Sequence, residues 1–173
     1  MSNYFKDIST FWKDSDYARE EYINETPSAE LVKEIEKELG YKLPDSYVEL
    51  MQSQNGGIPI NTCFPTNEAT SWADDHVAIH GILGIGREKT YSLCGEVGSK
   101  FMIDEWEYPD IGIYFGDCPS AGHDMFCLDY RACGKNGEPQ VVHVDQEDDY
   151  KITFLASSFE EFIKGLVNDE AFD

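Results

Sequence analysis

The sequence predicts an α+β fold, in which a mainly antiparallel meander of strands is flanked by N-terminal helices and a C-terminal helix. Near the start of the chain, apolar residues recur at the spacing of an amphipathic helix. After residue 57 the pattern changes to short runs rich in β-branched and aromatic residues, which is typical of strands. A further helical pattern closes the chain. Its 173 residues, of which 41% are hydrophobic, suit one globular domain.

Residues 1–27 are predicted to form an N-terminal helical arm, and residues 28–173 the α+β domain. In the arm, Phe5, Ile8, Phe11 and Trp12 recur at helical spacing. We therefore expect one short amphipathic helix here, packed on the main body.

Two helices should follow the arm. The apolar face of the first consists of Leu31, Val32, Ile35 and Leu39. Thr26 or Ser28 could cap its start, and Gly40 should end it. The second should follow Pro44 and end at Asn55-Gly56-Gly57, where the residues tolerate a left-handed backbone.

Seven segments are predicted as strands: 58–60, 77–80, 82–85, 111–115, 125–130, 141–144 and 152–155. No helix-length pattern interrupts residues 112–155, so these strands should form an antiparallel meander. The Asn136-Gly137 turn should join two of them as a hairpin. The closing helix has a capping box, with Ser157 or Ser158 at its start. Its core face should consist of Phe159, Phe162, Ile163 and Leu166.

The charge balance limits the classes of partner. Lys and Arg number 13 and Asp and Glu 34, which gives a formal net charge of −21. This charge repels phosphate backbones and anionic membrane surfaces, so neither nucleic acid nor membrane binding is expected. It favours encounter with a basic protein, although it could also serve solubility alone.

No apolar run approaches the ~20 residues that span a bilayer, and residues 1–7 lack the pattern of a secretory signal. We therefore expect a cytoplasmic protein with reduced thiols, either a monomer or a weak homodimer, without a cofactor.

Residues 31–51, followed by Asn55-Gly56-Gly57, resemble the opening of the SUKH superfamily. The residues that match the family motif are Glu36, Leu43, Pro44, Tyr47, Asn55, Gly56 and Gly57. Physical chemistry assigns these residues structural roles. Weaker matches at 82–86, 113–117, 127–131 and 158–162 extend the resemblance over about residues 28–167.

The resemblance implies an α+β fold and a binding role. The superfamily includes bacterial immunity proteins, which neutralise toxins that are often nucleases, and fungal cell-wall regulators of the Smi/Knr type. The favoured hypothesis is an acidic immunity-type protein that neutralises a basic toxin domain by stoichiometric binding. A nuclease is the favoured class of toxin. A regulatory interaction module without a toxin is the alternative. A hydrolase is less favoured and no enzyme is predicted, because no residues satisfy the requirements for nucleophile, base and orienting group.

Two acidic segments that contain aromatic residues are the candidate partner-binding surface. The candidate residues are Asp104, Glu105, Trp106, Glu107, Tyr108 and Asp110, together with Trp72, Asp74 and Asp75. Aromatic anchors framed by charge are typical of binding hot spots. Alternatively, each acidic cluster, including a third at residues 147–149, is a solvated loop, and Trp106 and Tyr108 are core residues of an edge strand.

Metal binding is not expected. Cys118, His123, Cys127 and Cys133 lack the closely spaced cysteine pairs that are usual for structural zinc. Cys127 lies in an apolar run, where a thiol is usually a small core residue.

Overall fold

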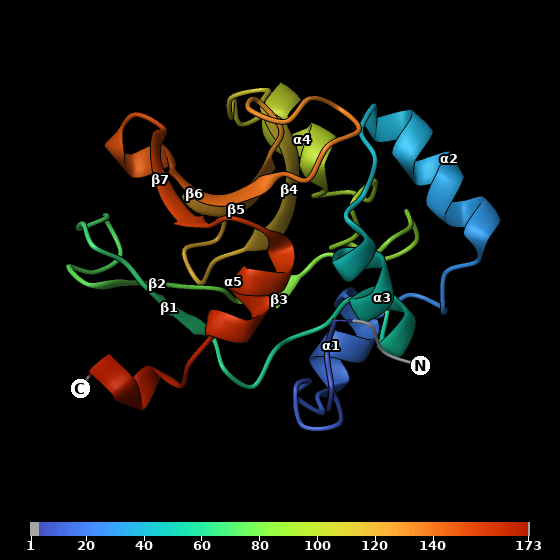
Figure 1. Ribbon diagram of the computed structural model, residues 1–173, viewed down its shortest axis with the longest axis horizontal. Coiled ribbons are helices and arrows are strands. Elements are labelled where there is room, and N and C mark those ends of the chain that lie inside the picture. Colours follow the sequence, from blue (N-terminus) through green and yellow to red (C-terminus); the bar gives the residue numbers. More distant parts are fainter. Residues whose placement is uncertain (1–3, 173) are drawn as a thin grey trace.

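A computed structural model describes residues 4–172 and has the predicted α+β architecture (Figure 1). Five antiparallel strands follow one another in chain order to form the main sheet. These strands are β3 (Gly81–Ile82), β4 (Gly112–Asp117), β5 (Asp124–Asp129), β6 (Gln140–Asp145) and β7 (Lys151–Ala156). A separate antiparallel pair is made by β1 (Cys63–Pro65) and β2 (His76–Ala78). The predicted fold class and antiparallel meander are confirmed.

The two faces of the sheet are covered by different helices. On one face, alternate residues such as Phe115 and Phe126 are fully buried in a cluster with Phe159 and Phe162 of α5 (Phe159–Gly165). This face also meets α3 (Asp45–Ser53), which contacts α5. On the other face, Tyr114, Met125 and Cys127 pack against Met102 of α4 (Ser99–Asp104).

The predicted capping residues explain where two helices begin. Ser28 precedes α2 (Ala29–Leu39), and its Oγ accepts a hydrogen bond from the Leu31 amide at 3.1 Å. Ser28 rather than Thr26 is therefore the cap. Gly40 ends α2 with φ +85°. Ser158 caps α5 in the same way, accepting from the Glu161 amide at 3.2 Å.

The prediction of a helix from Phe5 to Trp12 is wrong. These residues form turns, and the helix of the arm is α1 (Asp16–Glu21), capped by Ser15. The apolar residues of the turns are held by the body instead. Phe5 is buried in the main core, and the backbone of Phe11 accepts a hydrogen bond from the Ile60 amide at 2.9 Å. Contacts with the body thus override the helical spacing.

Several strand boundaries also differ from the prediction. Residues 58–60 make a single isolated bridge, between Pro59 and Trp12, and of the run at 82–85 only Ile82 belongs to a strand, the two-residue β3. The hairpin between β5 and β6 is confirmed, with Asn136-Gly137 inside a longer connection. Helix α4 and strand β1 were not predicted. Two short 3-10 turns, η1 (Gln146–Asp148) and η2 (Asp169–Phe172), complete the described chain.

Candidate functional site

The motif residue Asn55 joins three segments of the chain. Its side-chain amide donates to the carbonyls of Glu25, at 2.8 Å, and Ile85, at 2.9 Å. Its Oδ1 accepts from the Ile85 amide at 2.7 Å. The backbone carbonyl of Asn55 also accepts from Asn24 of the arm at 2.9 Å. Asn55 therefore connects the end of α3 to the arm and to residues 82–86, which is a structural role.

The other polar residues of the motif also bind backbone groups. Glu36 on α2 accepts a hydrogen bond from the Leu43 amide at 2.7 Å, which fixes the turn before Pro44. The fully buried Tyr47 on α3 donates to the carbonyl of Leu83. Burial raises the pKa of Tyr47 well above 10, so its hydroxyl remains a donor. Both side chains therefore hold backbone segments of the fold together.

Gly56 and Gly40 provide a matched test of the motif. Both have positive φ, +95° and +85°. A Cβ on Gly56 would lie 2.6 Å from the carbonyl oxygen of Tyr22, whereas a Cβ on Gly40 would meet no atom within 4 Å. We expect Gly40→Ala to cost about 1 kcal/mol of unfolding free energy. Gly56→Ala should cost at least about 2 kcal/mol more, because it adds overpacking against backbone atoms. Urea denaturation of both variants measures the difference, and equal losses would show that the arm yields at this contact.

The structure links the two halves of the predicted partner surface through the β6–β7 turn. Ser71, beside Trp72, donates from its amide and its hydroxyl to the buried carboxylate of Asp145, at 2.8 and 2.7 Å. On the other side of the turn, the Tyr150 hydroxyl donates to the Trp106 carbonyl at 2.5 Å. The acidic residues of the turn, 147–149, therefore lie between the two segments.

We call these three acidic segments the acidic end of the sheet. Its exposed acidic residues are Asp74, Asp75, Asp104, Glu105, Glu107, Glu147, Asp148 and Asp149. The sequence indicated each cluster separately but held no signal that they meet. Asp104 is the last residue of α4, and Glu105 to Glu107 follow it. Trp72 is 43% exposed.

Two candidate residues do not belong to this surface. Tyr108 is 2% exposed and its hydroxyl donates to the Gly122 carbonyl at 2.6 Å, so it supports the core. Asp110 is exposed but lies just before the start of β4. That end of the antiparallel sheet is opposite to the β6–β7 turn. For Tyr108, the core alternative applies, although its segment is coil and not an edge strand.

The indole of Trp106 is half-buried against the loop before β5. Its ring lies edge-on to His123, with centroids 5.5 Å apart. It also lies over Gly122, where an added Cβ would come within 3.1 Å of the indole. His123 in turn contacts Glu147 of the β6–β7 turn at 2.8 Å. Trp106 is therefore held in place while one part of its surface remains accessible.

A second polar cluster, which the sequence did not indicate, lies close to Trp106. The buried hydroxyl of Tyr22 donates to Asp117 at 2.7 Å and lies 2.8 Å from Nδ1 of His80. Burial, followed by the charge of Asp117, raises the pKa of Tyr22 well above its usual value. The hydrogen bond to Asp117 raises the pKa of His80 above 6.5. Tyr22 comes from the arm, and His80 and Asp117 lie at the two ends of the 80–117 segment. No local sequence pattern could therefore reveal this cluster.

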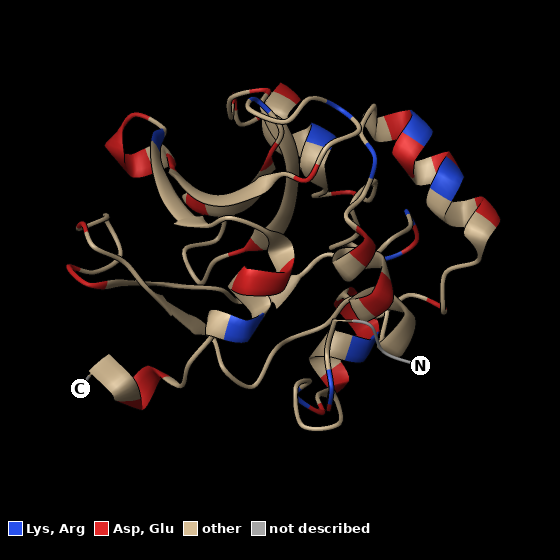
Figure 2. Ribbon diagram, in the orientation of Figure 1, with Lys and Arg blue, Asp and Glu red and all other residues tan. Residues whose placement is uncertain are grey.

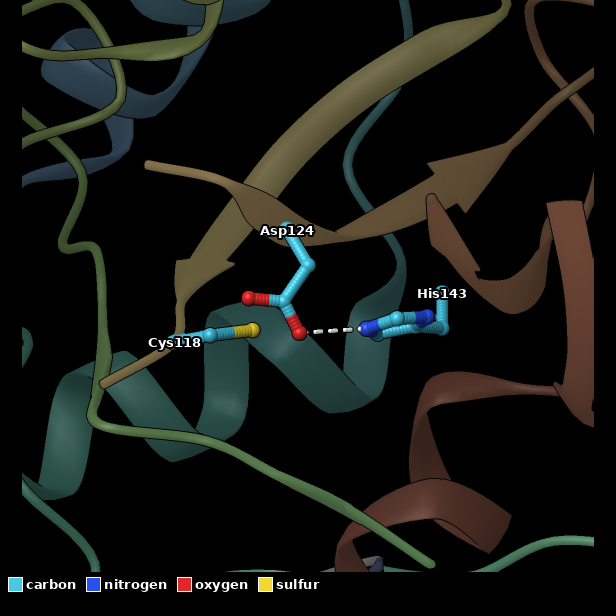
Figure 3. A group of neighbouring side chains, drawn as sticks. All are labelled: Cys118, Asp124 and His143. Atoms are coloured by element: carbon cyan, nitrogen blue, oxygen red, sulfur yellow. Dashed lines mark hydrogen bonds and ion pairs between the residues drawn. The ribbon is translucent and has the colours of Figure 1, made fainter. Parts of the chain in front are cut away.

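Within residues 4–172, three buried side chains of the types that can ligate a metal gather on the sheet face covered by α5: Cys118, Asp124 and His143 (Figure 3). Their ligand atoms all lie within 4.8 Å of one another. Asp124 Oδ2 lies 2.6 Å from Nε2 of His143, and Oδ1 accepts from the hydroxyl of Ser120. Of the four residues Cys118, His123, Cys127 and Cys133, which lie close together in the sequence, only Cys118 belongs to this cluster.

The chemistry of this cluster fits a hydrogen-bonded carboxylate. Burial, followed by the charge of Asp124, raises the pKa of Cys118 well above 9, so the thiol keeps its proton. Burial alone would raise the pKa of Asp124, but hydrogen bonds from His143 and Ser120 outweigh it and lower the pKa below 3.8. A metal would require the thiolate of Cys118 and would replace the bond between Asp124 and His143. A thiol that keeps its proton is likewise a poor nucleophile.

Comparison with known protein families matches residues 29–163 to a SUKH family described as SMI1-KNR4 cell-wall. The match covers most of the chain, including the motif residues and the main sheet. A comparison with curated proteins finds no match. Within residues 4–172, no helix is both long and apolar enough to cross a bilayer. The chain belongs to the SUKH superfamily, which includes toxin-immunity proteins.

Proposed function

We propose that this protein is an immunity-type inhibitor that neutralises a basic toxin domain by stoichiometric binding, with a nuclease as the favoured class of toxin. The observation that carries the proposal is the acidic end of the sheet on a member of a family that includes immunity proteins. Nuclease domains that bind phosphates are commonly basic, and an acidic inhibitor can occupy the same groove.

The distribution of charge supports this role. Figure 2 shows acidic residues over many elements and few basic ones. Six of the basic side chains already pair with carboxylates: Arg19, Lys42, Arg87, Arg131, Lys151 and Lys164. Within residues 4–172, Asp104, Glu105 and Glu107 form no ion pair with Lys or Arg. They are therefore available to a basic partner.

The alternative is a regulatory interaction module of the Smi/Knr type without a toxin partner. The cell-wall description of the matched family favours it. Both functions use the same fold and differ in the partner that binds.

Purification of the tagged chain from its native host distinguishes the two. We expect one basic protein to be retained at low salt and released at high salt, and its nuclease or other toxic activity to be abolished at a 1:1 ratio. Raising the salt concentration should slow association far more than it speeds dissociation. Recovery of cell-wall or signalling proteins without inhibition would support the regulatory alternative instead.

Charge reversal at the acidic end tests the surface. Changing Asp104, Glu105 and Glu107 together to Lys should weaken toxin binding at least tenfold, about 1.4 kcal/mol. The reason is that three negative charges become three positive charges where the partner's basic surface docks. The melting temperature should change little, because exposed substitutions typically alter stability by less than about 0.5 kcal/mol each.

A second triple variant controls for the overall change of charge. Glu20, Asp169 and Glu170 are exposed and lie on α1 and η2. Changed together to Lys, they should reduce affinity less than threefold. Equal losses of affinity in the two variants would leave only a general effect of net charge and would remove the acidic end from the interface.

A further inference from the structure

A small groove opens beside Trp106, between α4 and the loop before β5. Its volume is about 120 Å³, and its lining residues include Tyr91, Phe101, Trp106 and Asp117. Pockets for cofactors and drug-sized ligands usually measure ~300–1,000 Å³. The space in this groove suits a single side chain of a protein partner.

The walls of the groove are aromatic and held in place. Tyr91 stacks on the buried ring of Tyr22, with centroids 4.6 Å apart and planes 9° from parallel. Trp106 is fixed by its contacts with Gly122 and His123. A rigid aromatic wall binds a side chain at a low cost in conformational entropy.

Asp117 supplies a negative charge to the groove. It ends β4, and its side chain is 11% exposed. Its Oδ1 accepts from the Tyr22 hydroxyl, and its Oδ2 lies 3.3 Å from Nδ1 of His80. A carboxylate can accept about four hydrogen bonds, so Asp117 retains capacity for a further donor. No Lys or Arg is among the residues that line the groove.

Taking the proposed function as given, we infer that this groove receives one arginine side chain of the basic partner. The planar guanidinium stacks on Trp106 and Tyr91 and donates to the free positions on Asp117. An apolar side chain would leave Asp117 desolvated without a new partner, which is unfavourable. The acidic end, which includes Asp104 to Glu107 beside the groove, attracts the basic surface that carries this arginine.

A titration without the partner tests the groove on its own. N-acetyl-arginine amide is added to the full ¹⁵N-labelled chain, and the indole N–H resonances of Trp106 and Trp72 are followed. The resonance of Trp106 should shift and saturate, and that of Trp72 should stay in place. The citrulline analogue, which has the same shape without the charge, should bind at least tenfold more weakly. No shift at Trp106, or equal binding of citrulline, would overturn the assignment.

Variants separate the charge from the aromatic wall. Asp117→Asn keeps an acceptor for the Tyr22 hydroxyl but removes the charge, and it should weaken arginine binding at least tenfold. Trp106→Ala should do the same. Phe154→Ala removes another aromatic ring, 56% exposed on β7, and should change the affinity less than twofold. Melting temperatures within a few degrees of the parent establish that the variants are folded.

The same variants then separate the groove from the function. If the basic toxin is retained and inhibited equally by the Asp117→Asn and Trp106→Ala variants, the groove is not the arginine site, although the proposed function stands. If arginine binds as expected but no basic protein is retained or inhibited, the proposed function fails. Loss of at least tenfold in toxin affinity in both variants, but not in Phe154→Ala, supports the two together.

Discussion

Replacing Asn55 by Ala should lower the free energy of unfolding by about 3–5 kcal/mol. Asn55 is 2% exposed, and its side chain makes three hydrogen bonds, two with the backbone of Ile85 and one with the carbonyl of Glu25. Alanine would leave these buried backbone groups without partners, at about 1–3 kcal/mol for each unsatisfied group. Because a domain of this size is stable by only about 5–15 kcal/mol, the loss is a large share of the total.

The measurement is urea denaturation followed by tryptophan fluorescence. Asn67 lies exposed in the β1–β2 loop, and Asn67→Ala should change the unfolding free energy by less than about 0.5 kcal/mol. Asn55→Asp is a second probe, because it keeps the acceptor for the Ile85 amide but loses both donors. It should also be strongly destabilised. A loss below about 1 kcal/mol in Asn55→Ala would mean that water replaces the side chain, and the motif would then need another explanation.

The parts of the fold that the sequence predicted are those with local signals. Helices α2 and α5 have a periodic apolar face and a serine cap, and the strands β4 to β7 carry apolar and aromatic runs. Helix α4 has neither signal. Its apolar residues, Phe101 to Ile103, are consecutive, and no side chain caps its start at Gly98. It forms because Met102 packs on the sheet, which is a tertiary effect.

The candidate site shows the same limit. The alternation of acidic and aromatic residues along the chain could not predict that Trp106 would remain partly accessible while Tyr108 would be buried. The contacts that assemble the acidic end are between residues far apart in sequence, such as Ser71 and Asp145. The groove needs Asp117, Tyr91 and Trp106 together. Only the tertiary structure brings such residues into one place.

The buried pair Asp124 and His143 should make the stability of the core sensitive to acid. Asp124→Ala is expected to cost about 3–5 kcal/mol at pH 7, because it leaves a buried donor on His143 unpaired. His143 is already under-satisfied. Within residues 4–172, its Nδ1 and the hydroxyl of its cross-strand neighbour Thr153 are the buried side-chain polar atoms without a hydrogen-bond partner. The exposed Asp148 is the control, and Asp148→Ala should cost less than about 0.5 kcal/mol.

The pH dependence gives the sign of this contribution. The pKa of Asp124 is lower in the folded state than its usual value of 3.8, so its carboxylate stabilises the fold at every pH above that value. The contribution is lost as the pH falls from about 4 through the lower folded-state pKa, because the group must then bind a proton. Denaturation of the parent and the variant from pH 7 to pH 2 should therefore show a difference in stability that narrows below about pH 4. A constant difference across that range would show that the loss comes from packing, since the removal of side-chain atoms does not depend on pH.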